Sequence, residues 1–139
     1  MGTFAYPFRV KFDNVDYARV LYFPRQIDFY VEALEEFCIR ELGLSFRKML
    51  DDDRIAMPTV HLDVDYRAPL QFEEEAEVHV SVRAIGQKSV TFGFEVYRLP
   101  DRLLTSRATQ IVATVDYNTW QSIPVPEAYR KALERYVGR

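Results

Sequence analysis

Apolar and polar residues alternate along five segments of the chain, and a longer segment between the first two repeats its apolar residues every three or four positions. Strict alternation is typical of β-strands with one buried face, whereas the longer repeat is typical of an amphipathic helix. The alternating segments are 6–12, 59–69, 75–85, 89–99 and 105–117. The pattern therefore predicts one strand, one long helix and then four strands.

The alternation also predicts which strand residues face the interior. In the first strand, Phe8, Val10 and Phe12 are expected to be buried, while Arg9 and Lys11 face outward. The inward residues expected of the second strand are Val60, Leu62, Val64 and Tyr66. The opposite, polar face of the sheet is expected to be wet or to meet a partner; it carries His61, Asp63, Asp65, Glu77, His79 and Arg83.

The long helix is expected to begin at Pro24, because proline is favoured in the first helical turn, and to end at Gly43. Its apolar stripe consists of Ile27, Tyr30, Val31, Leu34, Phe37, Cys38 and Leu42. Residues 45–53 read as a short helical turn that ends in an acidic loop, and residues 125–137 read as a terminal helix.

Short turn sequences separate the last three strands, at Gly86-Gln87 and Pro100-Asp101, so these strands are expected to pair as an antiparallel meander. One apolar helix and one sheet with a single buried face can cover each other. With 139 residues and no linker or internal repeat, the chain is expected to be a single α+β domain spanning residues 1–139.

The composition excludes several classes of function. A net charge of −3 with interspersed acids and bases argues against a nucleic-acid partner. No apolar run approaches the ~20 residues of a transmembrane helix. The single cysteine, Cys38, cannot form an internal disulfide, and with no secretion signal pattern at the N-terminus the expected location is the cytoplasm.

Most familiar catalytic patterns are missing from the sequence. It has no serine or cysteine in a nucleophile-elbow setting and no glycine-rich phosphate loop. The two histidines, His61 and His79, are too few and too dispersed for a zinc site, so no metal is expected. Cys38 falls on the apolar stripe of the long helix and is expected to be an inert buried thiol. Asp51, Asp52 and Asp53 are expected to form a solvated acidic run.

Asp16 is the acid that remains to be explained. It stands among large apolar residues, a few positions before the expected helix start at Pro24. The first N–H groups of a helix have no intrahelical partner, and a carboxylate facing such donors is an arrangement suited to acyl transfer. The alternative is that Asp16 caps a turn between a strand and a helix. The residues around Asp16 favour the capping role, but they exclude neither capping nor a role in acyl transfer.

The stretch "VKFDNVDYARVLYFPRQIDFYVEALEEF" resembles the signature of hot-dog-fold thioesterases of the 4-hydroxybenzoyl-CoA and Tol-Pal-associated acyl-CoA thioesterase class. The resemblance continues through "TVHLDVDYRAPLQFEEEAEVHV" and "VDYNTWQSIPVPEAY", and so covers nearly the whole chain. It implies a hot-dog fold, with an antiparallel sheet of five or six strands wrapped around one long central helix. It also implies an enzyme that hydrolyses acyl-CoA thioesters.

The resemblance assigns roles to particular residues. The catalytic acid falls on Asp16, acting as base or nucleophile, and the oxyanion donor is the backbone N–H of Phe23. Tyr22 matches an aromatic residue of the acyl pocket, and Lys88 and Ser89 match a segment that contacts the nucleotide end of coenzyme A.

The sequence departs from the family pattern at two positions near Asp16. Asn14 stands where the family has the first acid of a pair, which removes a charge near Asp16. Arg19 stands where the family has a small residue; it is expected to pair with Asp16, to contact a phosphate or acidic acyl tail, or to fill space. A further polar substrate-binding position, contributed across a dimer, falls on Thr59 or His61.

The implied substrate is an acyl-CoA with an aromatic or a short to medium-length acyl group, with acyl carrier protein as the alternative carrier of the thioester. The alternative function is a non-catalytic hot-dog protein that binds acyl-CoA or acyl carrier protein. No cofactor is implied, because coenzyme A is part of the substrate. One open sheet edge in a single copy predicts a homodimer or homotetramer.

Overall fold

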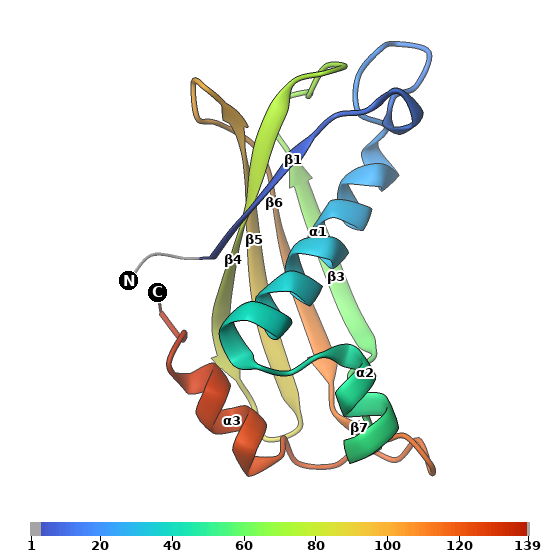
Figure 1. Cartoon of the computed structure of the whole chain (residues 1–139), viewed down its shortest axis with the longest axis vertical. Coiled ribbons are helices and arrows are strands. Elements are labelled where there is room, and N and C mark those ends of the chain that lie inside the picture. The colour runs from blue at the N-terminus through green and yellow to red at the C-terminus, as the bar shows by residue number, and fades with distance from the viewer. Residues whose placement is uncertain (1–3, 139) are drawn as a thin grey trace.

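A five-stranded antiparallel sheet and one long helix form the body of the computed structural model, which describes residues 4–138 (Figure 1). The strand order is β1-β4-β5-β6-β3. The strands are β1 (Phe4–Arg9), β3 (Thr59–Tyr66), β4 (Glu75–Ile85), β5 (Ser89–Leu99) and β6 (Leu103–Ala113). The predicted meander is confirmed for β4, β5 and β6, whereas β3 joins the far side of β6 and becomes an edge strand.

The long helix α1 runs from Phe23 to Phe37 and continues through a π-helical turn, η2, at Cys38–Leu42. Gly43 follows with φ +67, a left-handed conformation that glycine adopts without steric cost and that ends helices. The predicted helix limits are therefore confirmed at both ends, within one residue at Phe23.

The core lies between α1 and the sheet. The ring of Tyr30 on α1 stacks on Phe94 of β5, with centroids 5.1 Å apart, and Phe29 stacks on Phe8 of β1 at 4.0 Å. Alternate valines of the central strands complete the contact, which explains the period of two in the sequence. These buried valines are Val78, Val80, Val82, Val90 and Val96. The α+β hot-dog architecture expected from the sequence is confirmed.

Short elements close the end of the sheet opposite the start of α1 (Figure 1). They are α2 (Phe46–Lys48), a second π-helical turn η3 (Met49–Asp53), the small pair β2 (Ile55–Ala56) and β7 (Val115–Asp116), and α3 (Glu127–Glu134). The pair β2–β7 was not expected from the sequence, because two-residue strands carry no alternation.

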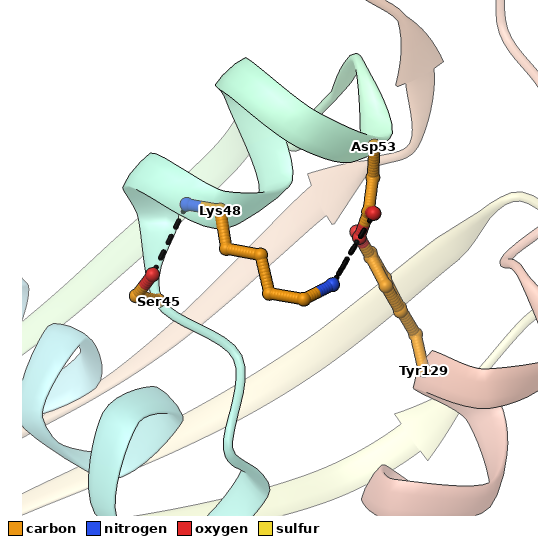
Figure 2. A network of polar contacts seen from close by, with 4 residues as sticks. All are labelled: Ser45, Lys48, Asp53 and Tyr129. Atoms are coloured by element: carbon orange, nitrogen blue, oxygen red, sulfur yellow. Dashed lines mark hydrogen bonds and ion pairs between the residues drawn. The ribbon is translucent and has the colours of Figure 1, made fainter.

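A polar network ties η3 to α3 (Figure 2). The Tyr129 hydroxyl donates to Asp53 Oδ2 at 2.5 Å, and Lys48 Nζ lies 3.1 Å from the same oxygen. Ser45 caps this segment by accepting a hydrogen bond from the backbone N–H of Lys48. Asp53 is therefore a structural residue, and the prediction of a purely solvated acidic run is wrong for its last member.

Burial predictions are wrong at the end of the first strand, on β3 and for Val31 of α1, which is 47% exposed. Phe12 is 81% exposed, because β1 ends at Arg9 and Phe12 starts a 3₁₀ turn (η1, Phe12–Asn14) that turns its ring onto Phe72. On β3, Val60 is 62% exposed and Leu62 and Tyr66 are partly exposed, since this strand lies at the edge of the sheet and a β-bulge between Thr59 and His61 interrupts its alternation. The apolar face of β3 is thus an uncovered surface in a single chain.

Candidate functional site

A tight loop joins β1 to α1 and carries Asp16. Val15 and Leu21 form an antiparallel bridge at its base, and the Asp16 N–H donates to the Val20 carbonyl at 3.1 Å. The Tyr22 N–H donates to the Asn14 carbonyl at 2.9 Å. These bonds fold the loop back on itself, with Asn14 beside Tyr22, the residue before α1, and Asp16 beside Val20.

The Asp16 side chain is exposed, and one of its oxygens has a local role. Oδ1 accepts a hydrogen bond from the Ala18 N–H at 2.8 Å, which is the turn-capping role considered from the sequence. Within residues 4–138, Oδ2 has neither a hydrogen bond nor an ion pair. Asp16 therefore caps its own loop and keeps one carboxylate oxygen available.

The first turn of α1 offers a backbone donor. Phe23 is the first helical residue, Pro24 has no N–H, and the Arg25 N–H already donates to the Tyr22 carbonyl at 2.8 Å. The Phe23 N–H has no intrahelical acceptor and finds none elsewhere in the described part of the chain. It is thus a free donor at the positive end of a long helix.

The sheet edge anchors this helix start. The Tyr66 hydroxyl, at the end of β3, donates to the Phe23 carbonyl at 2.9 Å, and the two rings meet edge to face at 5.9 Å. Tyr22, the N-cap residue, packs its ring against Phe23 at 5.5 Å. Burial raises the pKa of the Tyr66 hydroxyl, so it remains a donor at neutral pH.

Arg19 and Asn14 take structural positions in the loop. Arg19 has φ +68, the left-handed region in which glycine is preferred, which gives a physical reason for the family's small residue there. Among residues 4–138 it forms no ion pair with Asp16. Asn14 Oδ1 accepts from the Lys11 N–H at 2.7 Å. Among the described residues, neither side chain forms a hydrogen bond or an ion pair with Asp16.

A cavity of about 330 Å³ opens beside the helix start. Its wall combines the first turns of α1 with the segment that follows β3. The lining residues include Leu21, Phe23, Gln26, Tyr66, Arg67 and Leu70. Phe29, on the same helix, packs in the core against Phe8 and is not among the lining residues. The sequence did not predict Gln26 as a site residue, because a glutamine beside the apolar stripe of a helix belongs to no recognisable motif.

The remaining predicted residues lie at the other end of the sheet. Thr59 pairs with Val112, which in turn pairs with Val90, so Thr59 lies at the end of the sheet where the β4–β5 hairpin carries Lys88 and Ser89. The strand β5 has eleven residues and spans roughly 33 Å. Asp16 and Phe23 are at the end where Tyr66 pairs with Ser106. One chain therefore does not bring all the predicted residues together.

Thr59 lines a second, apolar cavity of about 180 Å³ between α1 and the sheet. Its Oγ1 accepts a hydrogen bond from Gln110 Nε2 at 2.7 Å. Cys38 also lines this cavity, and burial raises the pKa of its thiol to about 12, as expected of an inert cysteine. His61 is exposed on β3, where Nε2 lies 2.9 Å from Asp63 Oδ2.

The model of the thioesterase-like superfamily matches residues 10–133. The chain belongs to this superfamily. It is 26% identical over 130 residues to the acyl-CoA thioesterase YbgC of Haemophilus influenzae, covering 94% of this chain and 93% of that one. It is 23% identical to a 1,4-dihydroxy-2-naphthoyl-CoA hydrolase of Synechococcus elongatus, covering 96% and 97%.

The crystal structure of Slr0204, a 1,4-dihydroxy-2-naphthoyl-CoA thioesterase from Synechocystis, superposes with a TM-score of 0.87 at 23% identity. The match covers 95% of this chain and 96% of that one. The likeness confirms the hot-dog fold, and the superfamily match confirms the resemblance recognised in the sequence.

No group of three or more potential metal ligands occurs among residues 4–138. In the same range, no helix combines the length and the apolar character needed to cross a bilayer.

Proposed function

We propose that this chain hydrolyses acyl-CoA thioesters, with the Asp16 carboxylate as base or nucleophile and the Phe23 N–H as oxyanion donor. The observation that carries the proposal is the loop geometry. A carboxylate with one unpartnered oxygen lies in the loop that leads directly into a helix whose first N–H is free. The superfamily of the chain and the names of its relatives support the same reaction class.

The proposed chemistry follows from these two groups. Acting as a base, Asp16 takes a proton from water while the water oxygen forms a bond to the thioester carbonyl carbon. The carbonyl electron pair moves onto oxygen, where the Phe23 N–H and the helix dipole stabilise it. The C–S bond then breaks, and the thiolate of coenzyme A leaves and takes up the proton. As a nucleophile, Asp16 would instead form an anhydride that water hydrolyses to the same products.

The separation of the predicted residues supports a site shared by two copies. Two β3 edges that pair antiparallel about a twofold axis bring the Thr59 end of one strand to the Tyr66 end of the other. Thr59 or His61 of one copy would then approach Asp16 and Phe23 of its partner. Lys88 and Ser89, at the same end as Thr59, would contact the coenzyme A part, and Arg19 and Asn14 would line the mouth of the site.

Aromatic residues at the helix start favour an aromatic or a short to medium-length acyl group. Phe23 and Tyr66 line the nearby cavity, and Tyr22 lies against Phe23. Flat rings pack well on other aromatic rings. Coenzyme A or acyl carrier protein would deliver the acyl group.

The test compares Asp16→Asn with Asp13→Asn on a panel of aromatic and aliphatic acyl-CoAs, following thiol release. Asp13 lies in the same exposed segment and serves as the matched control. Loss of a primary catalytic group lowers kcat by a factor of ~100 or more, whereas the control is expected to keep wild-type activity. Full activity in Asp16→Asn would refute the assignment.

The hydrogen bond from Ala18 to Asp16 favours a second candidate, a binding module in which this acid is only structural. Such a protein would bind acyl-CoA or acylated carrier protein in calorimetry without releasing free thiol. The same panel separates the two functions.

A further inference from the structure

Gln26 is a polar residue whose role neither the fold nor the proposed chemistry explains. It lies on α1 one turn after Phe23 and is only 4% exposed. Its Oε1 accepts a hydrogen bond from the hydroxyl of Ser106 on β6. Ser106 Oγ in turn lies 2.6 Å from the hydroxyl of Tyr30, and both of these residues are fully buried.

The direction of this chain of hydrogen bonds follows from counting protons. Within the described residues, the buried Tyr30 hydroxyl has Ser106 Oγ as its single partner. If Ser106 donated to Tyr30, the Tyr30 proton would be buried without an acceptor, which is costly. Tyr30 therefore donates to Ser106, and the one proton of Ser106 goes to Gln26. Burial raises the pKa of Tyr30 to about 12, which keeps this donor protonated.

This order fixes the orientation of the Gln26 amide. Because Oε1 is the acceptor for Ser106, the NH₂ group points the other way. Nε2 has no acceptor among residues 4–138, although no side-chain nitrogen or oxygen in that range is both fully buried and unpartnered. Nε2 therefore reaches open space, and Gln26 lines the cavity at the helix start.

Phe23 and Gln26 are three residues apart and so share one face of α1. Helical side chains lean toward the N-terminus, which directs the Gln26 amide toward the free Phe23 N–H. Both residues line the same cavity. A thioester oxygen held by the Phe23 N–H would therefore lie in the cavity that Gln26 also lines.

We propose that Gln26 Nε2 donates a second hydrogen bond to the thioester oxygen as charge develops on it, and that Ser106 and Tyr30 position this amide. The inference rests on the proposed thioesterase function and adds a side-chain donor to the backbone donor. The hydrogen bond from Gln26 would stabilise the transition state through preorganisation, because a buried and oriented amide needs no rearrangement during the reaction.

The first test replaces Gln26 by methionine, which has a similar length and no donor, and by glutamate, which keeps the acceptor for Ser106 and loses the NH₂ group. Both variants are expected to lower kcat about 100-fold, the usual cost of losing one oxyanion donor, with KM changed less than about threefold. If the buried carboxylate of Gln26→Glu prevents folding, the methionine variant alone decides.

Thr105→Val is the matched structural control. Thr105 is fully buried beside Ser106 and donates to the Val96 carbonyl, so this variant also loses one interior hydrogen bond. It is expected to melt at a lower temperature than the wild type and to keep its kcat. A folded Gln26→Met variant with wild-type kcat would overturn the proposal.

A double-mutant cycle tests the positioning role of Ser106. Ser106→Ala is expected to lower kcat about tenfold in the wild-type background and to have no further effect in Gln26→Met, since the amide that it orients is then absent. Additive effects on kcat would show that Ser106 does not act through Gln26, and an unchanged kcat in Ser106→Ala would show that it acts only on stability; either result would overturn the positioning role. A wild-type protein without thiol release from any acyl-CoA would instead refute the thioesterase function itself.

Discussion

The left-handed backbone of Arg19 is a local strain in the loop that carries Asp16. A residue with a Cβ at φ +68 costs about 1 kcal/mol or more, whereas glycine adopts this conformation freely. We therefore expect Arg19→Gly to raise the free energy of unfolding by about 1 kcal/mol, measured by chemical denaturation.

The control for this prediction is Arg25→Gly, also an exposed arginine but within α1. It is expected to lower the free energy of unfolding by about 1 kcal/mol, since glycine is unfavourable inside a helix. A destabilised Arg19→Gly variant would show that the arginine side chain makes contacts that outweigh the strain.

The exposure of Phe12 shows a limit of predicting burial from the alternation of apolar and polar residues. The alternation Phe8, Val10, Phe12 continues past the last residue of β1, but pairing with the neighbouring segment ends at Val10, which exchanges hydrogen bonds with Glu73 and Glu74. Burial follows the end of hydrogen bonding, and this depends on a partner segment more than sixty residues away. The local pattern alone does not contain that information.

At the scale of elements, the bonds of Asp53 to Tyr129 and Lys48 hold η3 against α3. The Tyr129 hydroxyl, followed by Lys48, lowers the pKa of Asp53 below its ordinary value of 3.8. A depressed carboxyl pKa contributes stability that is present above the unfolded-state pKa and is lost as the pH falls through the folded-state value.

We therefore expect Tyr129→Phe to lower the melting temperature at pH 7, and expect the difference from the wild type to shrink below about pH 4. Thermal melts followed by circular dichroism between pH 7 and pH 2 measure both effects. Asp52→Asn, in the same acidic run, is expected to match the wild type at every pH. A difference for Tyr129→Phe that does not change with pH would assign its effect to packing alone.

The elements themselves were largely predictable from the sequence. The limits of α1 together with its continuation η2 followed from Pro24 and Gly43, and the central strands followed from their alternation, because both signals are local. The place of β3 was not predictable in this way, since its pairing with β6 joins residues that are far apart in the sequence, such as Tyr66 with Ser106 and Thr59 with Val112. The series of hydrogen bonds from Tyr30 through Ser106 to Gln26 was not predictable for the same reason, since Ser106 is distant in sequence from the other two residues.

At the scale of the whole molecule, the uncovered side of β3 predicts self-association. Val60 is 62% exposed on this edge, and unpaired edge strands readily pair with another chain. Light scattering after size-exclusion chromatography is expected to give at least twice the 16.4 kDa mass of the chain.

Val60→Asp is expected to shift the protein toward monomer and to lower activity in parallel, because a charge on this edge disfavours pairing. Leu103→Asp is the control, since Leu103 is also exposed but lies at the start of β6, in the β5–β6 hairpin. A monomeric wild-type protein with full activity would contradict the shared site.

The hydrogen bond from Tyr66 to the Phe23 carbonyl links the rim of the sheet to the first peptide of the helix. Any second chain that immobilises β3 would also hold in place the start of α1, where we propose that the Phe23 N–H stabilises the oxyanion. The association of two copies and the binding of a ligand would then be thermodynamically coupled, and such coupling is reciprocal. A tightly bound thioester analogue would strengthen the association between copies by the same factor that association strengthens its binding.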